Sequence, residues 1–198
     1  MTESSLGKIA SLLKTGKTPP SKIEQYFVQD YNWYTPGDIG KEKFLDESER
    51  GVSDKAIQDK KAFLYPENTL LITCIGNIGR VGISKVKCAS NQQITAIKPN
   101  EDVDVDYLYY WFIANQKKIA DISNNAVVPI LNNKSLKQVK LTYPSLSHQK
   151  QIAQTLDNAA ALRDKTQQLL AEYDQLAQSI FLDMFGDPVE NQKKNKLT

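Results

Sequence analysis

Few residues in this 198-residue sequence have the types and spacing that catalysis needs. The single histidine, His148, has no cysteine or acidic residue at metal-site spacing and is more typical of a surface or capping residue than of a general base. Cys74 and Cys88 lie in apolar segments and are interpreted as small buried hydrophobic residues, although a disulfide is open in principle. Residues 76–80 (GNIGR) lack the Lys-Ser/Thr pair and the following helix of a nucleotide-binding loop. The sequence therefore predicts that the chain is not an enzyme.

A second group of residues has the types that bind nucleic acid. Basic and amide side chains follow one another in one short stretch: Arg80, Lys85, Lys87, Asn91, Gln92 and Gln93. Arginine can pair with guanine, asparagine and glutamine with adenine, and lysine with phosphates. The same side chains are common on any hairpin surface, so the stretch by itself leaves both interpretations open.

The patterns around these residues predict a β-sheet with one short helix. Residues 69–75 and 81–86 are two β-branched runs joined by a Gly/Asn turn, which is typical of a β-hairpin. Residues 93–97 and 139–143 are further strand candidates, and residues 106–119 have the period of an amphipathic helix. We therefore expect an α+β fold, a mixed α/β domain with a twisted sheet core.

The C-terminal segment predicts a long helix of a different kind. Residues 147–185 contain no glycine or proline, Ser147 is a candidate N-cap, and Gly186 and Pro188 would end the helix. Apolar residues recur at heptad spacing, which favours a coiled coil. A helix of this length spans on the order of 55 Å, so its apolar stripe needs a partner helix. The expected dimer seam consists of Ile152, Ala159, Leu162, Thr166, Leu169, Tyr173, Leu176 and Ile180.

Composition and termini narrow the class of protein. The 25 basic and 23 acidic residues give a net charge of +2, so any affinity for phosphates must come from local patches. The N-terminus lacks the features of a signal peptide, and no stretch approaches the length of a membrane span. We expect a cytoplasmic protein without membrane contact. Its predicted parts are an α/β domain over 1–146, a helix over 147–186 and a tail over 187–198.

Several short motifs then occur in a fixed order along the chain. Each is weak alone, but together they span nearly the whole sequence: Leu6–Ile9 (LGKI), Gly16–Pro19 (GKTP), Trp33–Ile39 (WYTPGDI), Leu70–Ile72 with Gly76–Gly79 (GNIG), Asn91-Gln92, Tyr107–Tyr110 (YLYY) and Pro144–Ile152 (PSLSHQKQI). In this order they resemble the specificity subunit of type I restriction-modification systems. Members of that family usually carry two target-recognition domains and two long helices, whereas this chain has one of each. The tail resembles the family's linker into a second domain, so the chain resembles a half-subunit.

The resemblance implies a function in reading double-stranded DNA. It implies an antiparallel homodimer that reads a bipartite inverted repeat, with methylase and restriction subunits as partners. S-adenosylmethionine, ATP and Mg would serve those partner subunits, and this chain would hold no cofactor or metal. The methylase would grip the helix ends, around Ile152 and residues 181–185. The DNA contacts expected are Thr18, Lys41, Lys43, Arg80, Lys85, Lys87, Asn91, Gln92 and Lys134, while Trp33, Asp38, Gly76 and Gly79 would hold the fold.

Two alternatives remain beside this interpretation. One is a coiled-coil adaptor whose α/β head binds protein, and the other is a mimic of the specificity subunit that binds the methylase without reading DNA. A head without salt-dependent affinity for duplex DNA, even with methylase present, would favour the adaptor, whereas a mimic would bind the methylase yet block methylation.

Overall fold

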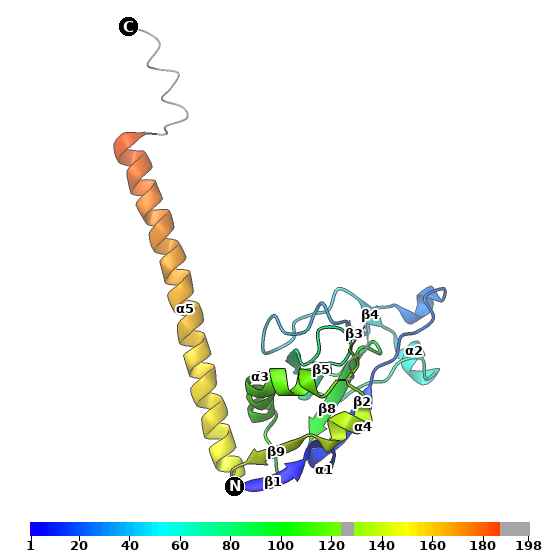
Figure 1. The fold of residues 1–198 in the computed structure, drawn as a ribbon. Coiled ribbons are helices and arrows are strands. Elements are labelled where there is room, and N and C mark those ends of the chain that lie inside the picture. Colours follow the sequence, from blue (N-terminus) through cyan, green and yellow to red (C-terminus); the bar gives the residue numbers. More distant parts are fainter. Residues whose placement is uncertain (124–128, 187–198) are drawn as a thin grey trace. The chain divides into compact units, whose positions relative to one another are not determined.

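The computed structural model describes residues 1–123 and 129–186 (Figure 1). The chain divides into two compact units, Met1–Ala153 and Gln154–Thr198. The predicted tail over 187–198, including Pro188, lies outside the described residues. Among the described helices, none is both long and apolar enough to cross a membrane.

A four-stranded antiparallel sheet forms the centre of the first unit. Its strand order is β2-β8-β5-β6, and each neighbouring pair is antiparallel. The predicted hairpin is confirmed, because β5 pairs with β6 from Thr69 opposite Ser84 to Ile72 opposite Val81. All residues of β5 and β6 are buried, which explains why these strands are continuous apolar runs. The bounds are Ala10–Thr15 (β2), Ile94–Pro99 (β8), Thr69–Thr73 (β5) and Val81–Ser84 (β6).

Two smaller sheets flank this centre. An antiparallel pair joins the start of the chain to residues that precede the long helix, and it lies beside α1 and α4 (Figure 1). A three-stranded sheet of order β4-β3-β7 contains a parallel pairing of β3 with β7. Their bounds are Thr2–Ser5 (β1), Lys140–Tyr143 (β9), Gly51–Val52 (β4), Tyr31–Tyr34 (β3) and Cys88–Ser90 (β7).

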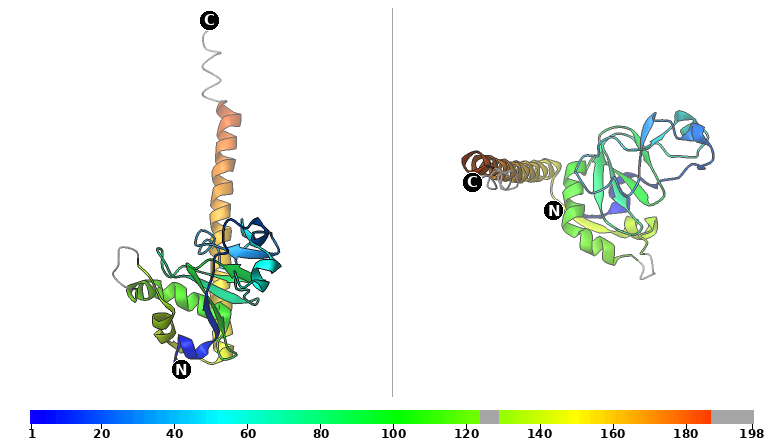
Figure 2. Two further views of the ribbon diagram at one scale, coloured as in Figure 1. Left: turned by 90° about the vertical axis from the view of Figure 1, so that its right-hand side faces the viewer. Right: turned by 90° about the horizontal axis from the view of Figure 1, so that it is seen from above.

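The helix α3, Val105–Asp121, covers one face of the four-stranded sheet (Figures 1 and 2). The Asp104 carboxylate caps it by accepting the Tyr107 backbone N–H at 3.0 Å. Its buried face consists of Leu108, Phe112 and Ile119, so the amphipathic helix predicted for this region is confirmed. The shorter helices are α1 (Leu6–Ile9), η1 (Glu24–Tyr26), α2 (Asp54–Gln58) and α4 (Asn133–Gln138).

The central sheet is buried on both faces. Along β5, Leu70 and Ile72 belong to the core cluster beneath α3, whereas Leu71 belongs to the cluster on the opposite face. Cys74 and Cys88 are free and buried in these two clusters, as predicted. Burial raises the pKa of both thiols, that of Cys88 to about 11, so both stay protonated near neutral pH.

The predicted long helix is confirmed as α5, Leu146–Phe185, with Gly186 in a left-handed conformation at its end. The prediction that Ser147 is the N-cap was wrong. The helix already includes Leu146, so Ser147 lies in the first turn, and the Ser145 hydroxyl just before the helix hydrogen-bonds His148 Nδ1 at 2.8 Å. The residues of the expected seam are exposed in the single chain, for example Leu162 at 67% and Tyr173 at 66%.

Candidate nucleic-acid interface

Loops from distant parts of the sequence meet at one end of the four-stranded sheet. Because neighbouring strands are antiparallel, β2 and β5 end where β8 and β6 begin. The connecting segments 15–18, 74–80 and 91–93 therefore lie at the same end. We call these three segments, together with residues 130–134, the loop edge.

Backbone hydrogen bonds hold the first of these segments against the third. The Gly16 N–H donates to the Ile94 carbonyl and the Lys17 N–H to the Ser90 carbonyl, both at 2.9 Å. The Thr18 hydroxyl donates to Gln92 Oε1 across a separation of 74 residues. A Cβ atom at Gly16 would lie 2.4 Å from the Ser90 carbonyl oxygen, so this approach requires glycine.

Residues 130–134 join the loop edge through Cys74 and Asn133. The Leu131 N–H donates to the Cys74 carbonyl at 2.9 Å, while the Cys74 N–H donates to the Gln93 carbonyl at 2.7 Å. Asn133 Oδ1 accepts the hydroxyls of Thr15 and Thr95 at 3.0 and 3.2 Å. These bonds place the start of α4, and with it Lys134, beside the ends of β2 and β8.

Three of these segments, 15–18, 91–93 and 130–134, contain four of the residues predicted to contact DNA: Thr18, Asn91, Gln92 and Lys134. Thr18, Gln92 and Lys134 are exposed. Asn91 is only 8% exposed, and its amide is used locally, because Oδ1 accepts the Gln93 N–H and Nδ2 donates to Gln93 Oε1, both at 3.0 Å. Asn91 thus shapes the turn that presents Gln92.

Arg80 closes the same loop edge at the start of β6. Its backbone is fixed by the Thr73 hydroxyl, which accepts the Arg80 N–H at 3.1 Å. Within residues 1–123 and 129–186, no hydrogen bond or ion pair engages its half-buried guanidinium. The backbone of Gly40 lies against the Arg80 side chain, since a Cβ at Gly40 would lie 2.8 Å from Arg80 Nε. The exposed Lys41 follows Gly40 directly, so it lies in the turn beside Arg80.

Lys43 and Lys85 lie in a different environment. Both flank the Asp106 carboxylate, at 2.9 and 4.0 Å, and β6 separates Lys85 from the loop edge. The Lys43 side chain is 12% exposed and its ammonium lies 4.9 Å from the Tyr110 ring centroid, while that of Lys85 lies 4.4 Å from the Phe44 centroid. The two lysines neutralise a half-buried carboxylate at the start of α3, and a DNA contact for either stays a prediction.

Lys87 is exposed in a hollow whose other charged residues are acidic. The hollow has a volume of about 550 Å³ and includes Asp30, Glu47 and Glu67. Three carboxylates lower the affinity of such a hollow for phosphate. A DNA contact for Lys87 likewise stays a prediction.

The residues predicted to hold the fold do so. Trp33 is 4% exposed and its indole N–H donates to the Lys17 carbonyl at 3.4 Å, beneath the loop edge. Asp38 accepts both the backbone N–H and the hydroxyl of Thr35, at 2.7 and 2.9 Å. Gly76 and Gly79 have φ angles of 76° and 85°, in the left-handed region that favours glycine.

Sequence reasoning missed two residues of the loop edge. Asn133 joins β2, β8 and α4 through its side chain, and nothing in its sequence context marks that role. Lys17 lies in the GKTP motif, and its ammonium donates to the Lys60 carbonyl at 2.6 Å. The motif was the available signal for Lys17, but only its threonine was chosen as a contact.

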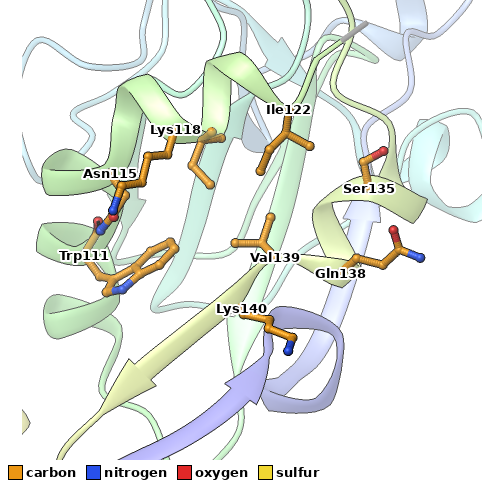
Figure 3. Close-up of a pocket in the computed structure, with 9 residues that line it drawn as sticks. Trp111, Asn115, Lys118, Ile122, Ser135, Gln138, Val139 and Lys140 are labelled. Atoms are coloured by element: carbon orange, nitrogen blue, oxygen red, sulfur yellow. Dashed lines mark hydrogen bonds between the residues drawn. The ribbon is translucent and has the colours of Figure 1, made fainter.

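A pocket of about 390 Å³ lies between α3, α4 and the start of β9 (Figure 3). Trp111 and Val139 contribute apolar side chains to its lining, and Lys118 and Lys140 contribute basic ones. Its lining contains no histidine, cysteine or carboxylate. No group of three or more His, Cys, Asp or Glu side chains able to hold a metal occurs in the described part of the chain. The pocket thus presents amide, hydroxyl and ammonium groups around apolar side chains.

Solved structures of two specificity subunits share the α+β fold described above. The HsdS subunit from Thermoanaerobacter tengcongensis has this fold, with a TM-score of 0.70 at 16% identity over 93% of this chain and 44% of that chain. The type I restriction-modification S subunit from M. genitalium gives a TM-score of 0.57 at 18% identity, over 92% and 48%. The predicted fold class is confirmed.

Sequence comparisons identify the family. Residues 1–173 match the family model described as the type I restriction modification DNA specificity domain, and the chain belongs to this family. The MjaIX specificity subunit of Methanocaldococcus jannaschii is 32% identical over 130 residues, which are 64% of this chain and 29% of that protein. The EcoR124I/EcoR124II specificity subunit of Escherichia coli is 27% identical over 109 residues, 53% of this chain and 27% of that protein. The chain thus spans less than half the length of these relatives.

Proposed function

We propose that this chain reads one half of a bipartite DNA site for a type I restriction-modification system and catalyses no reaction itself. The observation that carries this proposal is the loop edge, in a chain of the DNA specificity domain family. Its exposed side chains are hydrogen-bond donors and acceptors from four separate segments, held on a buried sheet. A rigid platform with projecting polar loops suits the reading of base edges.

The side chains at the loop edge suggest a division of labour. Gln92 can pair with adenine and Arg80 with guanine in the major groove. Thr18, whose hydroxyl donates to Gln92, would orient that amide, while Lys134 and Lys41 would contact phosphates. The other predicted contacts are less suited to reading bases. Lys43 and Lys85 flank the Asp106 carboxylate, and the Asn91 amide is used within its own turn. Lys87 lies in an acidic hollow.

The reactions directed by this recognition would belong to partner subunits. We propose that a methylase subunit carries S-adenosylmethionine and that a restriction subunit uses ATP and Mg, so that this chain needs no cofactor. The methylase would contact α5 near Ile152 and residues 181–185. Exposed apolar side chains support this assignment: Ile152 is 41% exposed and Phe181 53% exposed in the single chain.

Arg80 provides the sharpest test of sequence reading. We expect Arg80→Ala to weaken binding to the cognate half-site by roughly 5- to 150-fold, which corresponds to about 1–3 kcal/mol, and to change random-sequence binding little. The cognate motif comes from mapping methyl-adenine in cells that express this chain with a type I methylase. Arg50→Ala, an exposed arginine beside β4, is the matched control. Equal losses of affinity for cognate and random DNA would contradict base reading by Arg80. A wild-type chain that binds the methylase but has no salt-dependent affinity for DNA would instead favour an adaptor or a mimic.

We further propose that two copies pair through α5 as an antiparallel homodimer, so that the DNA site is an inverted repeat. Exposed apolar residues at heptad spacing support this, among them Leu169 at 43%, Leu176 at 55% and Ile180 at 50%. Within the described residues, the next longest helix, α3, buries its apolar face on the sheet and cannot cover this stripe.

Charge placed in the seam tests the dimer. We expect the double variant Leu162→Glu/Leu169→Glu to weaken self-association at least 100-fold, about 2.7 kcal/mol, because it buries four carboxylates per dimer. Sedimentation velocity measures the change. The control Ala161→Glu/Gln167→Glu adds the same charge on the side of the helix that faces away from the seam. A wild-type chain that is monomeric at micromolar concentration, or equal effects of both variants, would contradict the dimer.

A further inference from the structure

Two lysine ammonium groups converge on one aromatic ring beside the loop edge. Lys14 Nζ lies 3.5 Å from the centroid of the Phe63 ring, and Lys17 Nζ lies 5.9 Å from the same centroid. The Lys17 ammonium also donates to the carbonyl of Lys60 at 2.6 Å. Two segments of the first unit therefore meet at this ring, and we call the group formed by Lys14, Lys17, Phe63 and the Lys60 carbonyl the Phe63 cluster.

The Phe63 cluster has no counter-charge in the described part of the chain. No carboxylate among residues 1–123 and 129–186 lies within 4 Å of the ammonium of Lys14, Lys17 or Lys60. The two ammonium groups lie 3.5 and 5.9 Å from one ring centroid, and like charges around one ring repel each other unless an anion or a π face offsets them. The Phe63 ring offsets only part of the charge, since an exposed cation–π contact is weak. The arrangement is thus short of negative charge.

The position of the cluster indicates which anion it fits. Lys17 directly precedes Thr18, whose hydroxyl donates to Gln92, and Lys14 directly precedes Thr15 at the end of β2. Side chains that read bases are flanked by phosphodiesters of the same duplex, and lysine binds these as a point charge. An anion at the cluster would thus lie next to the groups assigned above to bases.

We propose that Lys14 and Lys17, ordered by Phe63 and the Lys60 carbonyl, form a phosphodiester-binding site that anchors the DNA backbone beside the loop edge. This inference rests on the proposed DNA-reading function. The cluster contributes affinity independent of sequence, and the loop edge contributes the discrimination between bases. Phosphate contacts of this kind release counterions, so they have a measurable salt signature.

Salt dependence of binding to a random-sequence duplex tests the site in the full chain. Each phosphate contact contributes about 0.9 to the slope of log K against log salt, so Lys14→Gln/Lys17→Gln should reduce the slope by roughly 1.8. The control Lys8→Gln/Lys98→Gln removes the same charge at the opposite end of the sheet, where Lys98 also donates to a backbone carbonyl, that of Glu67, at 2.6 Å. It should leave the slope nearly unchanged. Equal slopes for the two variants overturn the site, whereas a wild-type chain without salt-dependent binding overturns the DNA-reading function itself.

A second measurement needs no variant. Acetylation of surface lysines in the wild-type chain, read by mass spectrometry with and without duplex DNA, reports which ammonium groups the DNA covers. We expect DNA to protect Lys14 and Lys17 several-fold and to leave Lys8 and Lys98 unchanged. Unprotected Lys14 and Lys17 in a sample where DNA is bound overturn the site but leave the proposed function standing.

Discussion

Gln149 holds the first turn of α5 to the α/β unit, and its replacement has a calculable effect. The side chain is fully buried within Met1–Ala153. Its Oε1 accepts the Asp104 N–H at 2.9 Å, and its Nε2 donates to the carbonyls of Asp102 and Pro144 at 2.9 and 3.0 Å. One amide therefore satisfies backbone groups before α3 and after β9.

The substitution Gln149→Met keeps the length of the side chain and removes all three hydrogen bonds. A backbone group that faces this buried position costs about 1–3 kcal/mol when it is left without a partner. Three such groups lower the free energy of unfolding by at least about 3 kcal/mol, a large part of the roughly 5–15 kcal/mol that stabilises a domain. With a urea slope of about 1–3 kcal/mol per molar, the midpoint falls by roughly 1–3 M.

Urea unfolding followed by tryptophan fluorescence measures this loss, because Trp33 is 4% exposed in the folded unit. The matched control is Gln154→Met, which changes an exposed glutamine of the same helix whose Nε2 donates to Asn158 Oδ1 at 3.0 Å. We expect the control to change the free energy of unfolding by less than about 0.5 kcal/mol. A Gln149→Met chain within about 1 kcal/mol of wild type would refute the reasoning, since three backbone groups around a fully buried side chain would each have lost a hydrogen bond.

Two further predictions concern the loop edge and the core. Gly16→Ala should destabilise the fold by about 2 kcal/mol or more and weaken duplex binding, because its Cβ would overlap the Ser90 carbonyl oxygen. The control is Gly37→Ala, whose Cβ would meet nothing closer than 3.8 Å. Equal urea midpoints for the two variants would contradict the prediction. Burial raises the pKa of Cys88 from 9.0 to about 11 and that of Tyr65 from 10.0 to about 12. The folded chain holds these protons more tightly than the unfolded chain, so their contribution to stability is complete below pH 9 and is lost as pH rises from about 9 to 12. The free energy of unfolding, measured from pH 8 to 12, should therefore fall as the pH rises. Cys88→Ala should flatten the part of this fall that begins near pH 9. A wild-type free energy that does not change with pH would show that these groups titrate alike in the folded and unfolded chains.

Elements with a clear period were predictable from the sequence. The hairpin β5–β6 and strand β8 are apolar runs because both faces of the sheet are buried, and α3 and α5 repeat apolar residues at helical spacing. The pairing of β1 with β9 and the parallel pairing of β3 with β7 were not predicted. These strands are short and join segments far apart in sequence, so no local pattern records their partners.

The candidate site shows why closeness in sequence is a poor guide to closeness in space. Arg80 and Lys85 were grouped because only four residues separate them, but those residues are the strand β6, which spans roughly 13 Å. Lys85 consequently pairs with Asp106, away from Arg80. Thr18 and Gln92, 74 residues apart, share a hydrogen bond because the antiparallel pairing of β2 with β8 returns the chain to the same end of the sheet.

Under the proposed function, the same construction constrains how the loop edge can change the DNA sequence that it recognises. Residues of β5 and β6 are buried on both faces, so substitutions there disturb packing and cost stability. Residues of the loop edge are joined mainly through backbone bonds such as those of Gly16, Lys17 and Leu131, which are insensitive to neighbouring side chains. Exposed positions such as Gln92 can therefore vary while the platform stays intact. Specificity is thus separable from folding at the loop edge, whereas Gly16 and Asn133, which build the platform, are not free to vary in this way.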